Sequence, residues 1–254
     1  RLWPTSHRQL PQHQTYQIEQ LVAPPLITLD PTSEAEVRKL IARLPNKTSP
    51  LDYIHTSVLK SFADIFAPLI THLANLSFSE ECFPNQFKQA QVTPLLKKPG
   101  LDQNDPANYR PISNLNTIGK LIEWLILARL LPHVASTGNF NPLQSAYRKK
   151  HSTETALLKV LDDLYRIVDS KSAAVLIGLD LSAAFDTINH STLLQRIQHT
   201  FGIAGTAHQW LESYLGNRTQ YVQVGSTQSV PSSVVVGVPQ GSVLGPSLFS
   251  IYIL

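Results

Sequence analysis

Methionine is absent from the sequence, and the chain begins at Arg1. Because a translated gene normally starts with methionine, we expect an internal segment of a longer reading frame or a decayed copy. The single cysteine, Cys82, excludes an internal disulfide framework and is typical of a reducing compartment. We therefore expect an intracellular protein, nuclear or cytoplasmic, rather than a secreted one.

Long hydrophobic runs are also missing, so we expect no membrane association. The most apolar helical stretch, Leu121 to Leu131, is too short to span a bilayer and contains Glu123 and Arg129. The sequence shows no Cys/His cluster at zinc spacing, no Walker-type phosphate loop and no internal repeat. These absences exclude a zinc module, a P-loop enzyme and a solenoid.

The residues that are present describe a mildly basic globular chain. It has 254 residues, 43% of them hydrophobic, and a formal net charge of +3, enough for a core of one or two lobes. Basic clusters are usually solvated faces, but they also suit contact with phosphates. The first cluster contains Lys88, Lys97, Lys98 and Arg110, and the second contains Arg148, Lys149, Lys150 and His151.

Hydrophobic periodicity predicts helices mixed with a few strands, which indicates an α+β fold rather than a doubly wound sheet. Pro68 is expected to break or kink the second helical region. The expected helices cover 33–44, 57–78, 118–131, 153–168, 190–200 and 208–215, and the expected strands cover 90–96, 175–179, 220–224 and 233–238. Ordered structure is also expected again at 110–113, after a loop that begins at Pro99.

The most informative stretch is the apolar run Val175–Leu179, which predicts a buried strand ending at Asp180. A carboxylate at the end of a core strand is costly unless it is paired or binds a cation. Mg²⁺ prefers oxygen ligands and bridges substrate phosphates. Two interpretations stay open from this stretch alone: Asp180 binds a metal ion, or it caps a following helix.

A second motif, Gly237-Val-Pro-Gln-Gly-Ser-Val-Leu-Gly-Pro246, has glycines that permit close approach of backbone to a ligand. Together with Leu179-Asp-Leu-Ser-Ala-Ala-Phe-Asp186 it resembles the two palm motifs of non-long-terminal-repeat (LINE-type) retrotransposon reverse transcriptases. Further family-like segments are 93–100 with 108–113, 144–148 with 151–156, and 210–224, so the likeness covers roughly residues 30–254.

The resemblance implies a right-hand polymerase fold in which fingers and an incomplete palm follow an N-terminal helical extension. The expected parts are a linker or tail at 1–30, the extension at 31–88, fingers at 89–170 and palm at 171–254. The family's Asp-Asp motif is not reached by Leu254, and the family's thumb and endonuclease are missing too. The pair Asp162-Asp163 precedes Asp180 in the sequence, and the apolar residues around the pair repeat at helical spacing. The pair is therefore better explained as part of a solvated helix face.

The family's reaction is RNA-directed DNA synthesis, with an RNA template, a DNA primer and deoxynucleoside triphosphates as partners and substrates. Two Mg²⁺ (or Mn²⁺) ions clamp the attacking and leaving oxygens. The resemblance makes Asp180 the first metal ligand and gives Leu181 a backbone carbonyl contact, while Asp186 caps or orients the segment before His190. Because a second carboxylate is needed, we expect this chain alone to be inactive.

The resemblance also implies a nucleotide site. Lys98 and Arg110 match the residues that bind the triphosphate, and Lys97 is an alternative to Lys98. Phe185 matches the residue that screens the sugar 2′ position, although core packing would also explain it. Gln240 and Gly241 match the loop that supports the template and the new base pair.

Two residues of the second basic cluster complete the expected nucleic-acid contacts. Arg148 is expected at the template strand, with a structural ion pair as the alternative, and Lys149 lies beside it. Ser152 or Thr153 is better explained as a helix N-cap than as a nucleophile.

Two other functions stay open. One is a non-catalytic nucleic-acid-binding remnant, and the other is an inert pseudogene product. The latter would expose apolar strand edges at Val234–Val238 or Phe249–Leu254 and aggregate.

Overall fold

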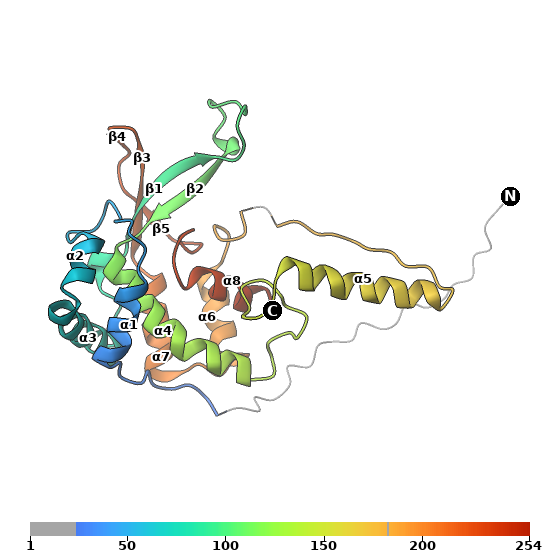
Figure 1. Cartoon of the computed structure of the whole chain (residues 1–254), viewed down its shortest axis with the longest axis horizontal. Helices are drawn as coiled ribbons and strands as arrows, with labels where there is room; N and C mark the ends of the chain where they lie inside the picture. Colours follow the sequence, from blue (N-terminus) through green and yellow to red (C-terminus); the bar gives the residue numbers. More distant parts are fainter. Residues whose placement is uncertain (1–23, 182) are drawn as a thin grey trace.

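The computed structural model describes residues 24–181 and 183–254, so most of the predicted linker or tail at 1–30 lies outside the described residues. These residues form an α+β fold in which a mixed sheet projects from a body of helices (Figure 1). The helices are α1 (Glu34–Arg43), α2 (Thr56–Ser61), α3 (Ala63–Ser79), α4 (Thr117–Ser136), α5 (Thr153–Asp169), α6 (His190–His199), α7 (Gly205–Leu215) and α8 (Gly245–Ile253).

The sheet is built around β1 (Gln89–Leu96). On one side β1 pairs antiparallel with β2 (Tyr109–Asn114), and on the other it pairs parallel with β3 (Arg218–Val224). The short strands β4 (Thr227–Gln228) and β5 (Ser232–Val234) both pair antiparallel with β3. The parallel pairing joins two distant parts of the sequence, because parallel strands need a long crossover connection.

The β1–β2 hairpin is buried at its base and exposed near its tip. Near its base, Ala90 and Val92 are buried, whereas Leu95 near the tip is 57% exposed. Pro94 faces Pro111 across the ladder, and neither residue can donate a backbone hydrogen bond there. The base therefore belongs to the core, while the distal half projects away from the body of the molecule (Figure 1).

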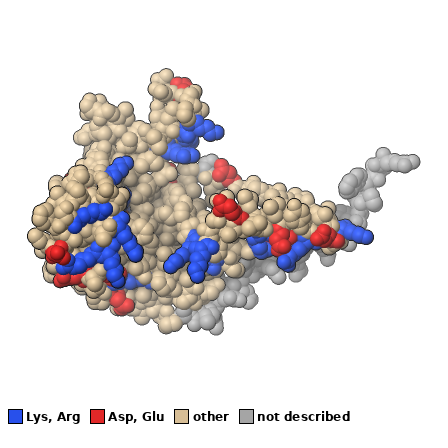
Figure 2. Space-filling view, in the orientation of Figure 1, with Lys and Arg blue, Asp and Glu red and all other residues tan. Residues whose placement is uncertain are grey.

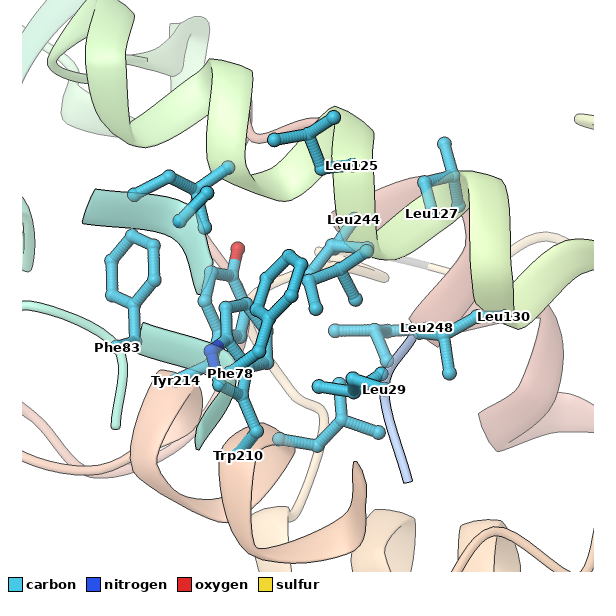
Figure 3. Close-up of a cluster of buried hydrophobic side chains, with 14 of the residues drawn as sticks. Leu29, Phe78, Phe83, Leu125, Leu127, Leu130, Trp210, Tyr214, Leu244 and Leu248 are labelled. Atoms are coloured by element: carbon cyan, nitrogen blue, oxygen red, sulfur yellow. The ribbon is translucent and has the colours of Figure 1, made fainter. Parts of the chain in front are cut away.

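The core lies among α1, α3, α4 and α7. Phe83 meets Trp210 and Tyr214 edge-on, with ring centroids 5.5 and 5.2 Å apart, and all three are buried. Figure 3 shows these rings together with leucines from α4 and α8. The Trp210 Nε1 donates to Ser77 Oγ at 2.9 Å, so its polar atom is satisfied inside the core.

Arg129 of α4 ties the N-terminal segment to the core. Its Nε donates to the Asp30 carbonyl at 2.6 Å, and its Nη2 donates to the Pro31 carbonyl at 3.0 Å. Its Nη1 lies 3.2 Å from Glu36 Oε1, and its guanidinium stands over the Phe78 ring. The charge that interrupts the apolar stretch of α4 thus holds the segment before α1 in place.

Most expected elements are confirmed, and the break in the second helical region is shifted. The break in the second helical region falls at Phe62, between α2 and α3, whereas Pro68 lies inside α3. An interior proline removes one bond to the carbonyl four residues earlier and crowds that carbonyl, but α3 continues through Pro68 to Ser79. Ser152 is the N-cap of α5, as expected, and forms a capping box with Thr155.

The predicted strand at Val175–Leu179 is wrong. The segment is extended but unassigned to any strand, and Val175 and Leu179 are 85% and 90% exposed. A strand requires a hydrogen-bonding partner, and within the described ranges no strand pairs with this one. The expected strand edge at Phe249–Leu254 is also wrong, because most of it lies in α8. A short apolar run alone does not separate helix from strand.

Candidate nucleotide-binding pocket

Two loops far apart in the sequence form one unit beside the sheet. The Val238 amide donates to the Phe185 carbonyl at 2.8 Å, and the Gly237 amide donates to the Ile188 carbonyl at 2.7 Å. His190 Nε2 lies 2.7 Å from the Gly237 carbonyl oxygen, at hydrogen-bonding distance. These backbone bonds hold the 183–190 loop against the 236–241 loop.

Glycine is required at two points of this unit. Gly237 has φ +84°, and a Cβ there would lie 2.9 Å from the Asp186 Cα. Gly241 has φ +127°, and its Cβ would lie 2.6 Å from the Ser113 carbonyl oxygen. Both contacts are closer than a side chain allows. The Ser113 amide also donates to the Gln240 carbonyl at 2.9 Å, so the second loop is docked on β2.

A pocket of about 310 Å³ opens between the β1–β2 hairpin and these two loops. It brings together four residues expected at a nucleotide: Lys97, Arg110, Phe185 and Gln240. Figure 2 shows basic side chains gathered on the hairpin. The complete lining is Lys97, Tyr109, Arg110, Pro111, Ala183, Ala184, Phe185, Asp186 and Gln240.

The charges of this pocket are unequal: two cations face one carboxyl group. Lys97 Nζ donates to the Ala107 carbonyl at 2.7 Å, which directs its ammonium toward the hairpin loop, and Arg110 is exposed. Partial desolvation raises the pKa of the Asp186 carboxyl group. The pocket as a whole suits an anion.

Phe185 occupies a fixed position in the pocket wall. Its ring lies edge-on to Tyr147, with centroids 6.3 Å apart, and 5.3 Å from the ring of Phe249. The side chain is only half-buried and also lines the pocket. The two roles expected for Phe185, packing and contact with a sugar, are therefore compatible.

The reverse transcriptase family profile, described as "Reverse transcriptase (RNA-dependent DNA polymerase)", matches residues 96–254. The chain belongs to this family.

The relatives of this reverse transcriptase chain are proteins of non-LTR retrotransposons. It is 31% identical over 252 residues to the "RNA-directed DNA polymerase from mobile element jockey" of Drosophila melanogaster, covering 98% of this chain and 27% of the relative. It is 34% identical over 230 residues to the "Probable RNA-directed DNA polymerase from transposon X-element" of the same species, covering 88% and 24%. The chain spans about a quarter of the length of these curated relatives.

A solved structure titled "Partial Cas6-RT-Cas1--Cas2 complex" aligns with 87% of this chain and 32% of that chain. The identity is 16% and the TM-score 0.42. Across the described segments, no helix has the length and apolar character needed to cross a bilayer.

The residue expected to bind metal in this reverse transcriptase chain is solvent-exposed. Asp180 and Leu181 lie in the extended segment after α5, where Leu181 is 60% exposed. Among the residues placed by the structure, no group of three or more His, Cys, Asp or Glu side chains could hold a metal ion. Asp180 is thus one carboxylate without the companions that a two-metal site requires, and the residues present do not fit a complete site.

The other predicted contacts of the reverse transcriptase lie outside the pocket. Lys98 is exposed beside Lys97 but does not line the pocket. Arg148 turns inward: its Nη1 donates to the Pro142 carbonyl at 2.9 Å and its guanidinium stands over the Phe140 ring, whereas Lys149 is exposed. Asp186, by contrast, lines the pocket, and the N-cap of the following helix α6 is Asn189.

Sequence reasoning missed the group that anchors the second loop of this reverse transcriptase. Glu123 Oε2 accepts hydrogen bonds from the amides of Val243 at 2.7 Å and Leu244 at 3.0 Å, and from the Tyr214 hydroxyl at 3.2 Å. Burial raises the pKa of Glu123, an effect that the hydrogen bonds and Arg218 oppose. The signal was present: a carboxylate within an apolar helical stretch is costly unless it has partners.

Arg218 is the nearby buried counter-charge. Its Nη1 donates to the Tyr214 carbonyl at 2.9 Å, and its guanidinium stands 4.8 Å over the Tyr214 ring. Burial raises the pKa of the Tyr214 hydroxyl and lowers that of the Lys88 ammonium, because each charged form is desolvated. This buried cluster therefore joins α4, α7 and β3 behind the pocket.

Proposed function

We propose that this pocket binds the incoming deoxynucleoside triphosphate of an RNA-directed DNA polymerase. The observation that carries the proposal is the meeting of Lys97, Arg110, Phe185 and Gln240 in one pocket of about 310 Å³, although they come from three separate segments. Pockets for small ligands usually begin at about this volume and combine apolar walls with a few polar groups. The remaining surface of such a substrate would face the template and primer.

Each wall of the pocket has a different proposed role. Lys97 and Arg110 neutralise the triphosphate, because charged donors bind phosphate oxygens strongly; Lys98, exposed on the same turn, is a further contact. Gln240 and Gly241 support the new base pair. The Phe185 ring closes the sugar side and excludes a ribose 2′ hydroxyl.

The metal contribution of this chain is proposed to be partial. We assign one Mg²⁺ (or Mn²⁺) contact to the Asp180 carboxylate and one to the Leu181 carbonyl. Because the two ions need more carboxylates than the described residues supply, we expect the 254-residue chain to be inactive alone. A primer-extension assay on an RNA template with Mg²⁺ checks this, and template-dependent product would contradict it.

Nucleotide affinity tests the pocket itself. We expect the chain with Mg²⁺ to bind dATP more tightly than ATP in isothermal titration calorimetry. Arg110→Gln should weaken dATP binding about tenfold or more, because one charge-assisted contact is lost. Phe185→Val should reduce the preference for dATP over ATP.

The matched control for the loss of charge is Arg166→Gln. Arg166 is exposed on α5, paired with Asp162, and does not line the pocket. Equal affinity for dATP and ATP in the unchanged chain, or equal losses in the two arginine variants, would refute the assignment.

A second candidate function is nucleic-acid binding without catalysis. The exposed Lys149 and the hairpin cations favour it, because they suit backbone phosphates of any sequence. Its affinity for RNA should fall steeply with added salt, since bound counterions are released. A flat salt response in a fluorescence-anisotropy titration would remove this candidate.

A further inference from the structure

Glu123 is a fully buried carboxylate surrounded by donors from two other segments. It is 1% exposed, on the face of α4 that also buries Ile126, Leu127 and Leu130. A carboxylate removed from water is strongly destabilising unless hydrogen bonds replace its hydration. Three donors meet one oxygen, Oε2: two backbone amides and the Tyr214 hydroxyl. The cost of burial is offset by the contacts to the second loop.

The two amides immediately precede α8, whose N-cap residue is Leu244. Helices leave their first N–H groups without partners in the helix, and negative charge is favourable there. Ser242 Oγ accepts from the Gly245 amide at 3.0 Å, which is a local cap. Glu123 accepts from the two preceding amides, Val243 and Leu244. The helix start is therefore held partly by its own residues and partly by α4.

The residues just before this helix start form the wall of the nucleotide pocket. Gln240 lines the pocket, and its carbonyl accepts from the Ser113 amide at the end of β2. Ser113 and Glu123 belong to the same stretch of chain, from β2 into α4. One continuous segment thus binds the Gln240 loop at two points. The Ser113 amide donates to the Gln240 carbonyl, and the Glu123 carboxylate accepts from the amides that follow the loop.

We propose that Glu123 is a positioning residue that sets Gln240 in the nucleotide pocket, with Gly241 next to it in the loop, by holding the amides of Val243 and Leu244. The inference rests on the proposed nucleotide site but has its own structural test. Tyr214 fixes the carboxylate from the opposite side, and Figure 3 shows Tyr214 and Leu244 in the cluster beneath α4. The helix α4, which follows the β1–β2 hairpin in the chain and carries Glu123, then fixes the Gln240 loop relative to Arg110 of the hairpin.

Hydrogen exchange of individual amides tests the anchor without any ligand. In Glu123→Leu, the amides of Val243 and Leu244 should exchange about tenfold faster or more, because their acceptor is gone. The amides of α1 and α3 should keep their protection. Glu123→Gln keeps an acceptor oxygen and should preserve protection at both amides.

The matched control is Glu212→Leu, which deletes an exposed carboxylate from α7, two residues from Tyr214. It should leave the Val243 and Leu244 amides unchanged. If Glu123→Leu fails to fold, Tyr214→Phe removes only the hydroxyl donor and should accelerate the same two amides. In the unchanged chain these amides must exchange slowly. Fast exchange there, or acceleration spread equally over all helices, would overturn the proposal.

Ligand affinities separate positioning from general damage. Glu123→Leu should weaken dATP binding about tenfold or more while RNA affinity stays within twofold, because the basic surface is untouched. Equal loss of both affinities would overturn the positioning role. If the unchanged chain binds no nucleotide, the proposed function fails, whereas the exchange result still decides whether Glu123 holds the loop.

Discussion

At the scale of single residues, Gly237 is where the two loops touch. Its amide and carbonyl both bond across the junction, and its α-carbon faces the Asp186 backbone with no room for a side chain. An alanine there would force the loops apart as well as adopt an unfavourable φ.

We expect Gly237→Ala to lower the free energy of unfolding by about 2 kcal/mol or more, since strain and a steric clash add. Urea denaturation followed by tryptophan fluorescence measures the change. Gly100→Ala is the matched control, because Gly100 has a similar φ of +85° with nothing within 4 Å of its Cβ position. Equal losses of unfolding free energy in both variants would show that the positive φ alone causes the loss. The close contact between the two loops would then contribute nothing.

Single residues also show how far the sequence predicts the site. Arg110, Phe185 and Gln240 stand in motifs, and all three line one pocket. The motif favoured Lys98 over Lys97, whereas Lys97 lines the pocket, because that choice depends on how the turn after β1 directs each side chain. Glu123 was missed as an anchor because its partners are backbone amides 120 and 121 residues away, which carry no signature of their own.

At the scale of elements, α5 stands apart from the rest. None of its residues is buried, and its long axis projects from the body of the molecule (Figure 1). Ion pairs between Lys159 and Asp163 and between Arg166 and Asp162 lie along it. Such pairs add only tenths of a kcal/mol to a helix whose length is marginal in isolation.

We therefore expect Leu161→Ala on α5 to change the free energy of unfolding by less than about 0.5 kcal/mol. Leu125→Ala on α4 should cost about 2–5 kcal/mol, because Leu125 is fully buried in the core. The two variants remove the same atoms, so urea denaturation compares burial alone. A large effect of Leu161→Ala would show that α5 packs against the body.

Elements also explain why prediction succeeded for helices and failed for one strand. The helix from Thr153 carries its own periodicity and its own cap at Ser152, so local sequence defines it even without packing. The run Val175–Leu179 has strand composition but needs a partner, and pairing is not local information. For the same reason the parallel alignment of β1 with β3 was not predicted.

At the scale of the whole molecule, apolar side chains are concentrated on one projecting region. The α5 side chains of Leu158, Leu161 and Tyr165 are 66%, 44% and 66% exposed, and they recur at helical spacing. Leu176 and Ile177 in the following segment are 68% and 76% exposed. Exposed apolar side chains gathered in this way favour association. We therefore expect association through this region rather than through the strand edge expected at Phe249–Leu254.

We expect the chain to self-associate with rising concentration in sedimentation velocity. Leu158→Glu should raise the protein concentration at which the chain self-associates about tenfold or more, because burying one leucine contributes about 1.5–3 kcal/mol. Leu69→Glu is the matched control, since Leu69 is 62% exposed on α3. Cooperative melting that does not depend on concentration would contradict this prediction and would also argue against an inert, unfolded product.

The pairing of β1 with β3 fixes an order of events on the ribosome. Paired residues such as Gln91 and Tyr221 are 130 positions apart. At typical elongation speeds, β3 emerges on the order of ten seconds after β1. During that interval β2 covers one edge of β1 while the other remains open, and an open strand edge is a site for wrong pairing. Any translation product that stops before Arg218 would keep that edge permanently and should depend on chaperones to stay dispersed.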